Sequence, residues 1–379
     1  MISDMENLSR REFIMTASVA TVAVAVPAFA ATHRQRVFVG SNTPNGILAY
    51  DWDPATAELT PAGVAAKFDN VDWITFSPDG KYLFAAAEVN LFNGKPTGAV
   101  ASYRVEKGAL QQLSAQNSVS TGTCHVALDR TGRVLLAADY FGGSAASFLV
   151  TDGKLSNAVW SEHYTEHGPD PERQPTAHAH FASFSPDNRF AYINDLGGDR
   201  IHIYSVDTAT AKLTAAGTYK TKAGAGPRTL HFHPNGHAAY SFNEMASPVD
   251  VLEWNKSNGL LTLVKVIQLL PEGYHGPTSG CDTVISKNGK DVYFANRGDT
   301  SLYHFHADFK TGSLTLVGHT TCGGKTPRNF VLDPTERWML VANQDSSQIS
   351  VFARNPETGA LANEGKSFAA ATPMCILFG

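Results

Sequence analysis

Short runs of alternating apolar and polar residues, separated by turns rich in Gly, Pro, Asn and Asp, fill the chain beyond its first thirty-five residues. Alternation with a period of two residues is typical of half-buried β-strands. The run at residues 82–86, for example, follows a Pro-Asp-Gly turn and precedes another turn and a further apolar run. No convincing amphipathic stretch with a period of 3.6 residues interrupts this pattern, which therefore predicts an all-β protein.

Two phrases recur about every fifty residues along the chain. The first is a Leu-Thr-like phrase whose leucines are Leu59, Leu110, Leu155, Leu213, Leu261, Leu314 and Leu361. The second is a hairpin turn of the Pro-Asp-Gly type after an apolar residue, at 76–80, 128–132, 184–188, 232–236, 285–289 and 332–336. Four short strands per repeat, repeated seven times, are typical of the blades of a β-propeller.

The two ends of the chain complement each other. Residues 372–378 have the pattern of an innermost strand with no blade after it, whereas 36–40 and 47–52 look like later strands with none before them. We therefore predict one seven-bladed β-propeller domain over 31–379, with four-stranded blades, one of them closed by the N- and C-terminal strands. Such closure hides the strand edges that an open ring would expose. A row of β-sandwich domains is the alternative, but it would not keep one register throughout.

Residues 1–30 are predicted to be a twin-arginine signal peptide. Arg10 and Arg11 precede an apolar run at 14–26, and the run ends in an A-x-A cleavage signal at 28–30. The run is shorter than the roughly 20 residues that a membrane span needs. An N-terminal helix that stays attached is the alternative. Cleavage would leave 379 − 30 = 349 residues, which would fold before export and act in the periplasm, with no membrane span.

Composition narrows the classes of function. The 43% hydrophobic and 17% charged residues are typical of neither a disordered chain nor a coiled coil. With 30 Lys and Arg against 35 Asp and Glu, the net charge is −5, so we expect no nucleic-acid partner. We expect a monomer that binds a small molecule. The four cysteines, far apart and without a C-x-x-C pair, exclude a zinc ribbon and predict buried thiols, an isolated disulfide being the alternative.

Alignment of the repeats on the hairpin turn brings charged residues to equivalent positions. Six residues before the proline position stand Asp72, Cys124, His180, Arg228, Cys281 and Arg328. Ten residues after it stand Glu88, Tyr140, Leu196, Glu244, Arg297 and Gln344. The first set starts innermost strands and the second ends the antiparallel neighbours, so both should crowd one end of the central channel. Burial of such charges without a purpose costs several kcal/mol, although salt-bridged residues that merely plug the channel are the alternative.

The motifs around these positions resemble the seven-bladed lactonase family, which includes bacterial propeller-type 6-phosphogluconolactonases and fungal carboxymuconate lactonising enzymes. The motifs are C-H-V-A-L-D (124–129), P-E-R-Q (171–174), H-A-H (178–180), G-P-R (226–228), F-N-E (242–244), N-R-G (296–298), G-G-K-T-P-R (323–328) and V-A-N-Q-D (341–345). The resemblance covers essentially all of the mature chain. It implies that the catalytic centre uses the His, Arg, Glu and Arg of four of these motifs, namely His180, Arg228, Glu244 and Arg297.

These residue types fit lactone chemistry. Opening a lactone needs a base and a cation that holds the developing oxyanion. We expect His180 to be the base, oriented by Glu244, and Arg228 and Arg297 to hold the oxyanion or a substrate carboxylate or phosphate. Further substrate contacts are predicted from Arg328, Asp282 and His125. Asp282 departs from the family, where relatives often carry Glu. This scheme needs no metal and no other cofactor.

Other motifs do not support a metal or nucleotide site. The pairs His178/His180 and His231/His233 could suggest zinc, but the second pair falls beside a hairpin turn, toward the other end of the strand from His180. A Gly-Lys-Thr triplet at 324–326 mimics a P-loop, but the position that requires the first glycine holds His319.

The sequence thus predicts a periplasmic lactonase that hydrolyses a sugar-acid lactone at the mouth of the channel. A muconate-type cycloisomerase and a non-catalytic binding or scaffold propeller are the alternatives. The family resemblance favours a phosphorylated lactone. The export signal favours a non-phosphorylated or carboxylated one, because phosphorylated gluconolactone is made in the cytoplasm.

Overall fold

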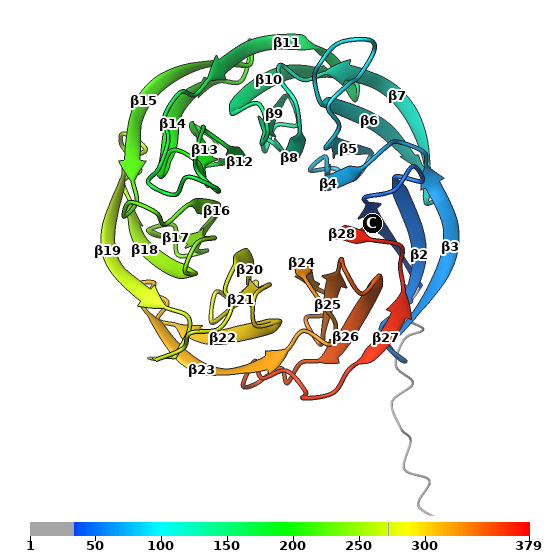
Figure 1. Ribbon diagram of the computed structural model, residues 1–379. Helices are drawn as coiled ribbons and strands as arrows, with labels where there is room; N and C mark the ends of the chain where they lie inside the picture. The colour runs from blue at the N-terminus through cyan, green and yellow to red at the C-terminus, as the bar shows by residue number, and fades with distance from the viewer. Residues whose placement is uncertain (1–33, 272) are drawn as a thin grey trace, which may run out of the picture. The chain divides into compact units, whose positions relative to one another are not determined.

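The computed structural model describes residues 34–271 and 273–379, which form seven four-stranded antiparallel sheets arranged around a central channel (Figure 1). The predicted all-β, seven-bladed propeller is therefore confirmed. The predicted signal peptide lies outside the described residues. Within them, no helix has the length and apolar character needed to cross a membrane.

Each blade runs from an innermost strand at the channel to an outermost strand at the rim. The first three blades comprise β28 (Pro373–Phe378), β1 (Gln35–Ser41), β2 (Ile47–Asp53) and β3 (Glu58–Ala66); β4 (Val71–Phe76), β5 (Tyr82–Ala87), β6 (Ala99–Glu106) and β7 (Ala109–Asn117); and β8 (Thr123–Leu128), β9 (Val134–Asp139), β10 (Ser144–Thr151) and β11 (Lys154–His163). The next two comprise β12 (Ala179–Phe184), β13 (Phe190–Asp195), β14 (Arg200–Asp207) and β15 (Lys212–Lys220); and β16 (Pro227–Phe232), β17 (Ala238–Asn243), β18 (Pro248–Trp254) and β19 (Leu261–Gln268). The last two comprise β20 (Gly280–Ile285), β21 (Asp291–Asn296), β22 (Ser301–Ala307) and β23 (Leu314–Thr321); and β24 (Pro327–Leu332), β25 (Trp338–Asn343), β26 (Gln348–Ala353) and β27 (Lys366–Ala369).

The ring closes in the predicted way. The C-terminal β28 pairs antiparallel with β1, with Phe38 opposite Leu377 and Val39 opposite Ile376. This pairing also explains why there are seven Leu-Thr-like phrases but only six hairpin turns. The two inner strands of the first blade come from opposite ends of the chain, so no turn joins them.

The six inner hairpins share one backbone conformation. Their glycine position has a positive φ, as at Gly80 (69°) and Gly132 (71°), a region that glycine enters without steric cost. Two of the hairpins have Asn188 (64°) and Glu336 (54°) there instead. Asn188 also donates a hydrogen bond through Nδ2 to Asp129 in the neighbouring blade, at 2.9 Å. Because the hairpins are alike, residues at the same distance from each hairpin lie at equivalent positions in their blades.

Hydrophobic packing holds the blades together. All residues of β9, β13, β17 and β21 are buried, because these strands are covered on both faces by adjacent blades. The outermost strands face water on one side, and β19 is mostly exposed. One cluster packs Leu136 and Ala138 of β9 against Ile193 of β13 and Tyr204 of β14. This rigid packing supports the polar residues at the channel.

The cysteines are free and buried, as predicted. Burial raises the pKa of the Cys124 and Cys375 thiols well above the ordinary value, so these groups stay protonated at neutral pH. We expect a thiol-specific reagent to react slowly with the native protein and to titrate all four cysteines, Cys124, Cys281, Cys322 and Cys375, once it is denatured without reductant. Fewer than four free thiols after denaturation would reveal a disulfide.

Candidate active site

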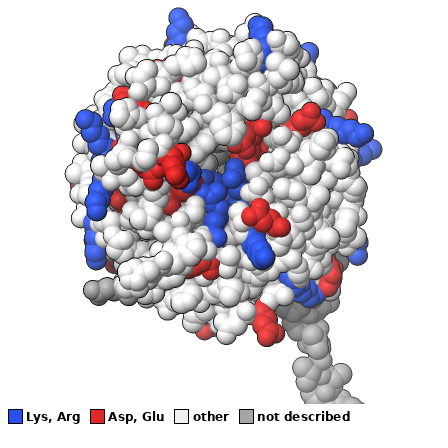
Figure 2. All heavy atoms as spheres, in the orientation of Figure 1, with Lys and Arg blue, Asp and Glu red and all other residues white. Residues whose placement is uncertain are grey.

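One end of the channel contains a polar cavity of about 140 Å³. Its lining residues are Glu88, Cys124, Tyr140, Arg173, His180, Arg228, Glu244, Arg297 and Arg328. Figure 2 shows basic side chains gathered in a hollow at the centre of one face, with acidic side chains beside them. The cavity is too polar for a hydrophobic ligand and has the charge for an anion.

The two sets of residues predicted from the repeat register meet here. His180, Arg228 and Arg328 are each the second residue of an innermost strand. Glu244 and Arg297 each follow directly after the second strand of a blade. Because these two strands run antiparallel, the start of one lies beside the end of the other. Four residues of each set line the cavity, whereas Asp72, Cys281, Leu196 and Gln344 are not among its lining residues.

A β-bulge aims the first set into the channel. The pairing register shifts at the same place in five blades, between residues 71 and 73, 123 and 125, 179 and 181, 227 and 229, and 327 and 329. The residue left unpaired at each shift is Asp72, Cys124, His180, Arg228 or Arg328. A bulge adds one residue to a strand and re-aims its side chain. Each of these residues interrupts the regular pairing of its strand, and the bulge turns its side chain toward the channel.

Glu244 holds three arginines together. Its Oε2 accepts hydrogen bonds from Arg228 Nη1 at 2.6 Å and forms an ion pair with Arg297 Nη2 at 2.8 Å, while Oε1 accepts one from Arg173 Nη2. Burial alone would raise the pKa of this carboxyl group. The charges of Arg297 and Arg228 outweigh burial and hold the pKa of Glu244 well below its usual range. Glu244 is thus a permanent anion at neutral pH.

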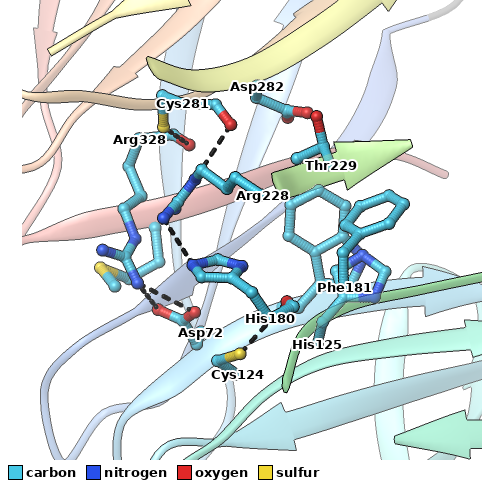
Figure 3. A pocket seen from close by; sticks show the side chains of 12 residues that line it. Asp72, Cys124, His125, His180, Phe181, Arg228, Thr229, Cys281, Asp282 and Arg328 are labelled. Atoms are coloured by element: carbon cyan, nitrogen blue, oxygen red, sulfur yellow. Dashed lines mark hydrogen bonds and ion pairs between the residues drawn. The ribbon is translucent and has the colours of Figure 1, made fainter. Parts of the chain in front are cut away.

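His180 does not have the partner that the sequence predicted. Its Nε2 lies 2.5 Å from Arg228 Nη1 (Figure 3), whereas the hydrogen bonds of Glu244 go to arginines. A guanidinium can only donate, so Nε2 accepts and the neutral ring carries its proton on Nδ1. Burial and then the charge of Arg228 lower the pKa of His180 well below its ordinary value. In this arrangement the lone pair of Nε2 is occupied and cannot take a proton.

Arg328 is paired within the channel as well. Its Nη2 donates to both carboxylate oxygens of Asp72, at 3.0 and 3.1 Å (Figure 3). The same nitrogen lies 3.9 Å from Oε2 of Glu88, beyond hydrogen-bond distance. Burial and then the charge of Asp72 raise the pKa of Glu88 to about 7. Glu88 belonged to the second register set but was not among the predicted site residues, so the register was the signal that could have identified it.

His125 and Asp282 do not line this cavity. They line a narrow space of about 20 Å³ next to it, which they share with His180, Arg228 and Arg328. His125 packs between the rings of Trp73 and Phe181, with ring centroids 4.4 and 4.0 Å away and interplanar angles of 43° and 36°. Asp282 accepts a hydrogen bond from Asn329 Nδ2 at 2.8 Å. Each lies one position further along its innermost strand than the residue counted from the hairpin turn, Cys124 or Cys281. Their predicted contact with substrate stays a prediction.

Arg173 is a cavity residue to which the sequence had assigned no role. It lies in the segment between β11 and β12, and its side chain is about half exposed (45%). The neighbouring Gln174 anchors this segment, since its Nε2 donates to Leu196 O and Asp199 Oδ1, both at 2.8 Å. The P-E-R-Q motif contributed to the family resemblance, but only the folded chain brings Arg173 to Glu244.

Two clusters of potential metal ligands occur among the described residues, and neither lines the cavity. One comprises Asp291, His304 and His306, and the other Glu166, Asp195 and His202. Arg354 Nη2 already donates to Asp291 at 2.5 Å, which disfavours a cation there. A mechanism without a metal remains a prediction.

Comparison with known proteins identifies the family. The family model described as "Lactonase, 7-bladed beta-propeller" matches residues 36–378. This chain belongs to the seven-bladed β-propeller lactonase family. The 6-phosphogluconolactonase of Bacillus subtilis is 30% identical to this lactonase-family chain over 347 residues, which cover 90% of this chain and 97% of the relative. That of Formosa agariphila is 32% identical over 337 residues, covering 86% and 94%.

A solved structure resembles this family member along almost its whole length. The periplasmic gluconolactonase of Pseudomonas aeruginosa has a TM-score of 0.86 and 32% sequence identity, and the match covers 91% of this chain and 98% of the other. The predicted family is therefore confirmed by sequence and by structure.

Proposed function

We propose that this protein hydrolyses a sugar-acid lactone at the arginine-lined end of its channel. The proposal rests on the polar cavity, which is lined by four arginine side chains and only two carboxylate side chains. Lactone hydrolysis builds negative charge on the carbonyl oxygen and ends in a carboxylate, and both are stabilised by guanidinium groups. The names of the relatives, 6-phosphogluconolactonase and gluconolactonase, support the same substrate class.

The roles of the arginines follow from their free donors. Arg297 donates from Nη2 to Ser279 Oγ at 2.8 Å and pairs with Glu244, but its buried Nε has no hydrogen-bond partner among the described residues. We assign the stabilisation of the developing oxyanion to the guanidinium group of Arg297, which lines the cavity. Arg228 is held by Cys281 O at 2.9 Å, His180 and Glu244, so it supplies a fixed positive charge. His180 orients Arg228 in this scheme.

The cavity argues against the alternative of a non-catalytic propeller whose charged residues only plug the channel. A purely structural plug would satisfy its charges and leave no space. Here about 140 Å³ remains beside the arginines, and buried donors are left over. Buried polar groups without partners are rare unless a ligand or water satisfies them.

We place the protein in the periplasm and infer a preference for a non-phosphorylated lactone. The twin-arginine pattern at 10–11 and the periplasmic relative support this location. There, sugar oxidation gives lactones without a phosphate group.

We expect the purified protein to hydrolyse gluconolactone well above the spontaneous rate, and with a higher kcat/KM than 6-phosphogluconolactone. A pH-indicator assay over a panel of phosphorylated and non-phosphorylated aldonolactones measures both. The loss of a needed phosphate–arginine contact costs about 1.5–3 kcal/mol, or roughly ten- to hundredfold in kcat/KM. An advantage of that size for the phosphorylated lactone would contradict the inferred preference, and no hydrolysis of any lactone would contradict the function.

A further inference from the structure

The proposed hydrolysis needs a group that accepts a proton from water, and the paired side chains of the cavity cannot serve. Both oxygens of Glu244 accept hydrogen bonds or ion pairs from arginines. Nε2 of His180 is occupied by Arg228. Burial raises the pKa of both the Cys124 thiol and the Tyr140 hydroxyl, so neither is a base near neutral pH.

Glu88 is the remaining titratable group of the cavity. It follows the last residue of β5, at the position in its blade that Glu244 and Arg297 occupy in theirs. Its backbone is fixed, since its N–H donates to Asn70 O at 2.9 Å. No hydrogen bond to its carboxylate is made by any residue in the described part of the chain, and only 16% of its side chain is exposed.

The arrangement around Arg328 explains why this carboxylate forms only a long ion pair and accepts no hydrogen bond from the described residues. Arg328 directs Nη2 to both oxygens of Asp72, and Glu88 stays 3.9 Å from the same nitrogen. Asp72 therefore neutralises the arginine that would otherwise bind Glu88. Asp72 and Glu88 share one arginine, and Asp72 takes its hydrogen bonds, so the oxygens of Glu88 stay able to accept a proton.

We propose that Glu88 is the general base that activates water in the hydrolysis proposed above, on which this inference rests. The water oxygen forms a bond to the lactone carbonyl carbon while one of its protons passes to the Glu88 carboxylate. Arg297 holds the resulting oxyanion. When the ring C–O bond breaks, Glu88 returns the proton to the leaving alkoxide oxygen, which gives a hydroxy acid. This assignment replaces His180 as the predicted base.

The electrostatic surroundings of Glu88 suit this role. Burial and then the negative charge of Asp72 raise its pKa to about 7, against the opposing charges of Arg328 and Arg228. His180 in the same cavity is neutral, because its own pKa is lowered. A base works best when its pKa is close to the working pH. We therefore expect kcat/KM to rise with pH through about 7 and to level off above it, as Glu88 loses its proton.

The first test compares Glu88→Gln with the wild-type protein on the lactone that is hydrolysed best, after subtraction of spontaneous hydrolysis at each pH. Removal of a general base lowers the rate by about 10²- to 10⁴-fold. We expect kcat to fall at least 100-fold, KM to change less than threefold, and the rise of kcat/KM near pH 7 to disappear. Glu88→Asp should restore part of kcat and a pH-dependent rise.

The second variant, Asp72→Asn, remains informative if Glu88→Gln does not fold. It removes the charge that raises the pKa of Glu88 and frees Arg328, so the rise in kcat/KM should move to lower pH. A merely structural role of Glu88 would not produce this shift. A wild-type-like kcat in Glu88→Gln, or an unmoved pH profile in Asp72→Asn, would overturn the assignment while wild-type hydrolysis still supported the proposed function. An inactive wild-type protein would instead contradict the function itself.

Discussion

Replacement of Arg297 by alanine is expected to lower kcat/KM for the substrate lactone by about 100- to 1000-fold, the effect of removing one oxyanion donor. The buried Nε of Arg297 has no partner among the described residues, and the side chain lines the cavity. Most of the loss should fall on kcat, because the donor matters most when the carbonyl oxygen becomes charged. Steady-state kinetics on the purified variant measure both parameters.

Arg104→Ala is the matched control for this experiment. Arg104 lies on β6, about half exposed (45%), and forms only a long ion pair with Glu106 at 3.7 Å. Its removal should leave kcat/KM unchanged, because it is not among the residues that line the cavity. If Arg297→Ala hydrolysed the lactone within threefold of the wild-type rate, Arg297 would not be the oxyanion donor.

Replacement of Glu244 by alanine is expected to lower the free energy of unfolding by about 3–5 kcal/mol, as for other buried ion pairs that lose one partner. The variant would leave Arg173, Arg228 and Arg297 without their shared carboxylate. Chemical denaturation followed by circular dichroism measures the change. Glu253→Ala on β18 is the control, since this exposed glutamate should contribute less than about 0.5 kcal/mol.

The destabilisation by Glu244→Ala should depend on pH in a defined direction. The pKa of Glu244 in the folded protein lies well below its ordinary value, which is about 4.3 in an unfolded chain. Its stabilising contribution is therefore complete above the unfolded pKa and is lost as the pH falls through the folded pKa. The difference between variant and wild type should be constant near neutral pH and narrow only below about pH 4. A difference under 1 kcal/mol at pH 7 would contradict the three-arginine pairing.

Glu88 and Glu244 occupy the same position in two blades but differ in their electrostatic surroundings. Both follow the second strand of a blade, and both line the same cavity. Glu244 is surrounded by arginines and stays ionised, whereas Glu88 lies beside Asp72 and has a pKa of about 7. Environments that separate the pKa values of two carboxyl groups commonly separate their roles, one as a structural or electrostatic anion and one as an acid or base.

The sequence by itself determined the architecture and the end of the channel at which the candidate residues gather. Strand alternation and turn residues act over a few neighbouring positions, so they can be read without the fold. The hairpin turns define the register, and the register brought His180, Arg228, Glu244 and Arg297 to one end of the channel. The complementary end segments likewise predicted the pairing of β28 with β1.

Only the tertiary structure decided which side chains pair and which remain free. Glu244 was predicted to orient His180, but it binds three arginines instead. These are Arg228 of its own blade, Arg297 of the next blade and Arg173 of the segment before β12. His125 and Asp282 line a narrow space next to the cavity rather than the cavity itself. Arg328 Nη2 donates to Asp72, so Glu88 stays 3.9 Å from that nitrogen. These outcomes depend on distances of a few ångströms between residues tens to hundreds of positions apart. Local alternation carries no information about such distances, because they are set by how the blades pack around the channel.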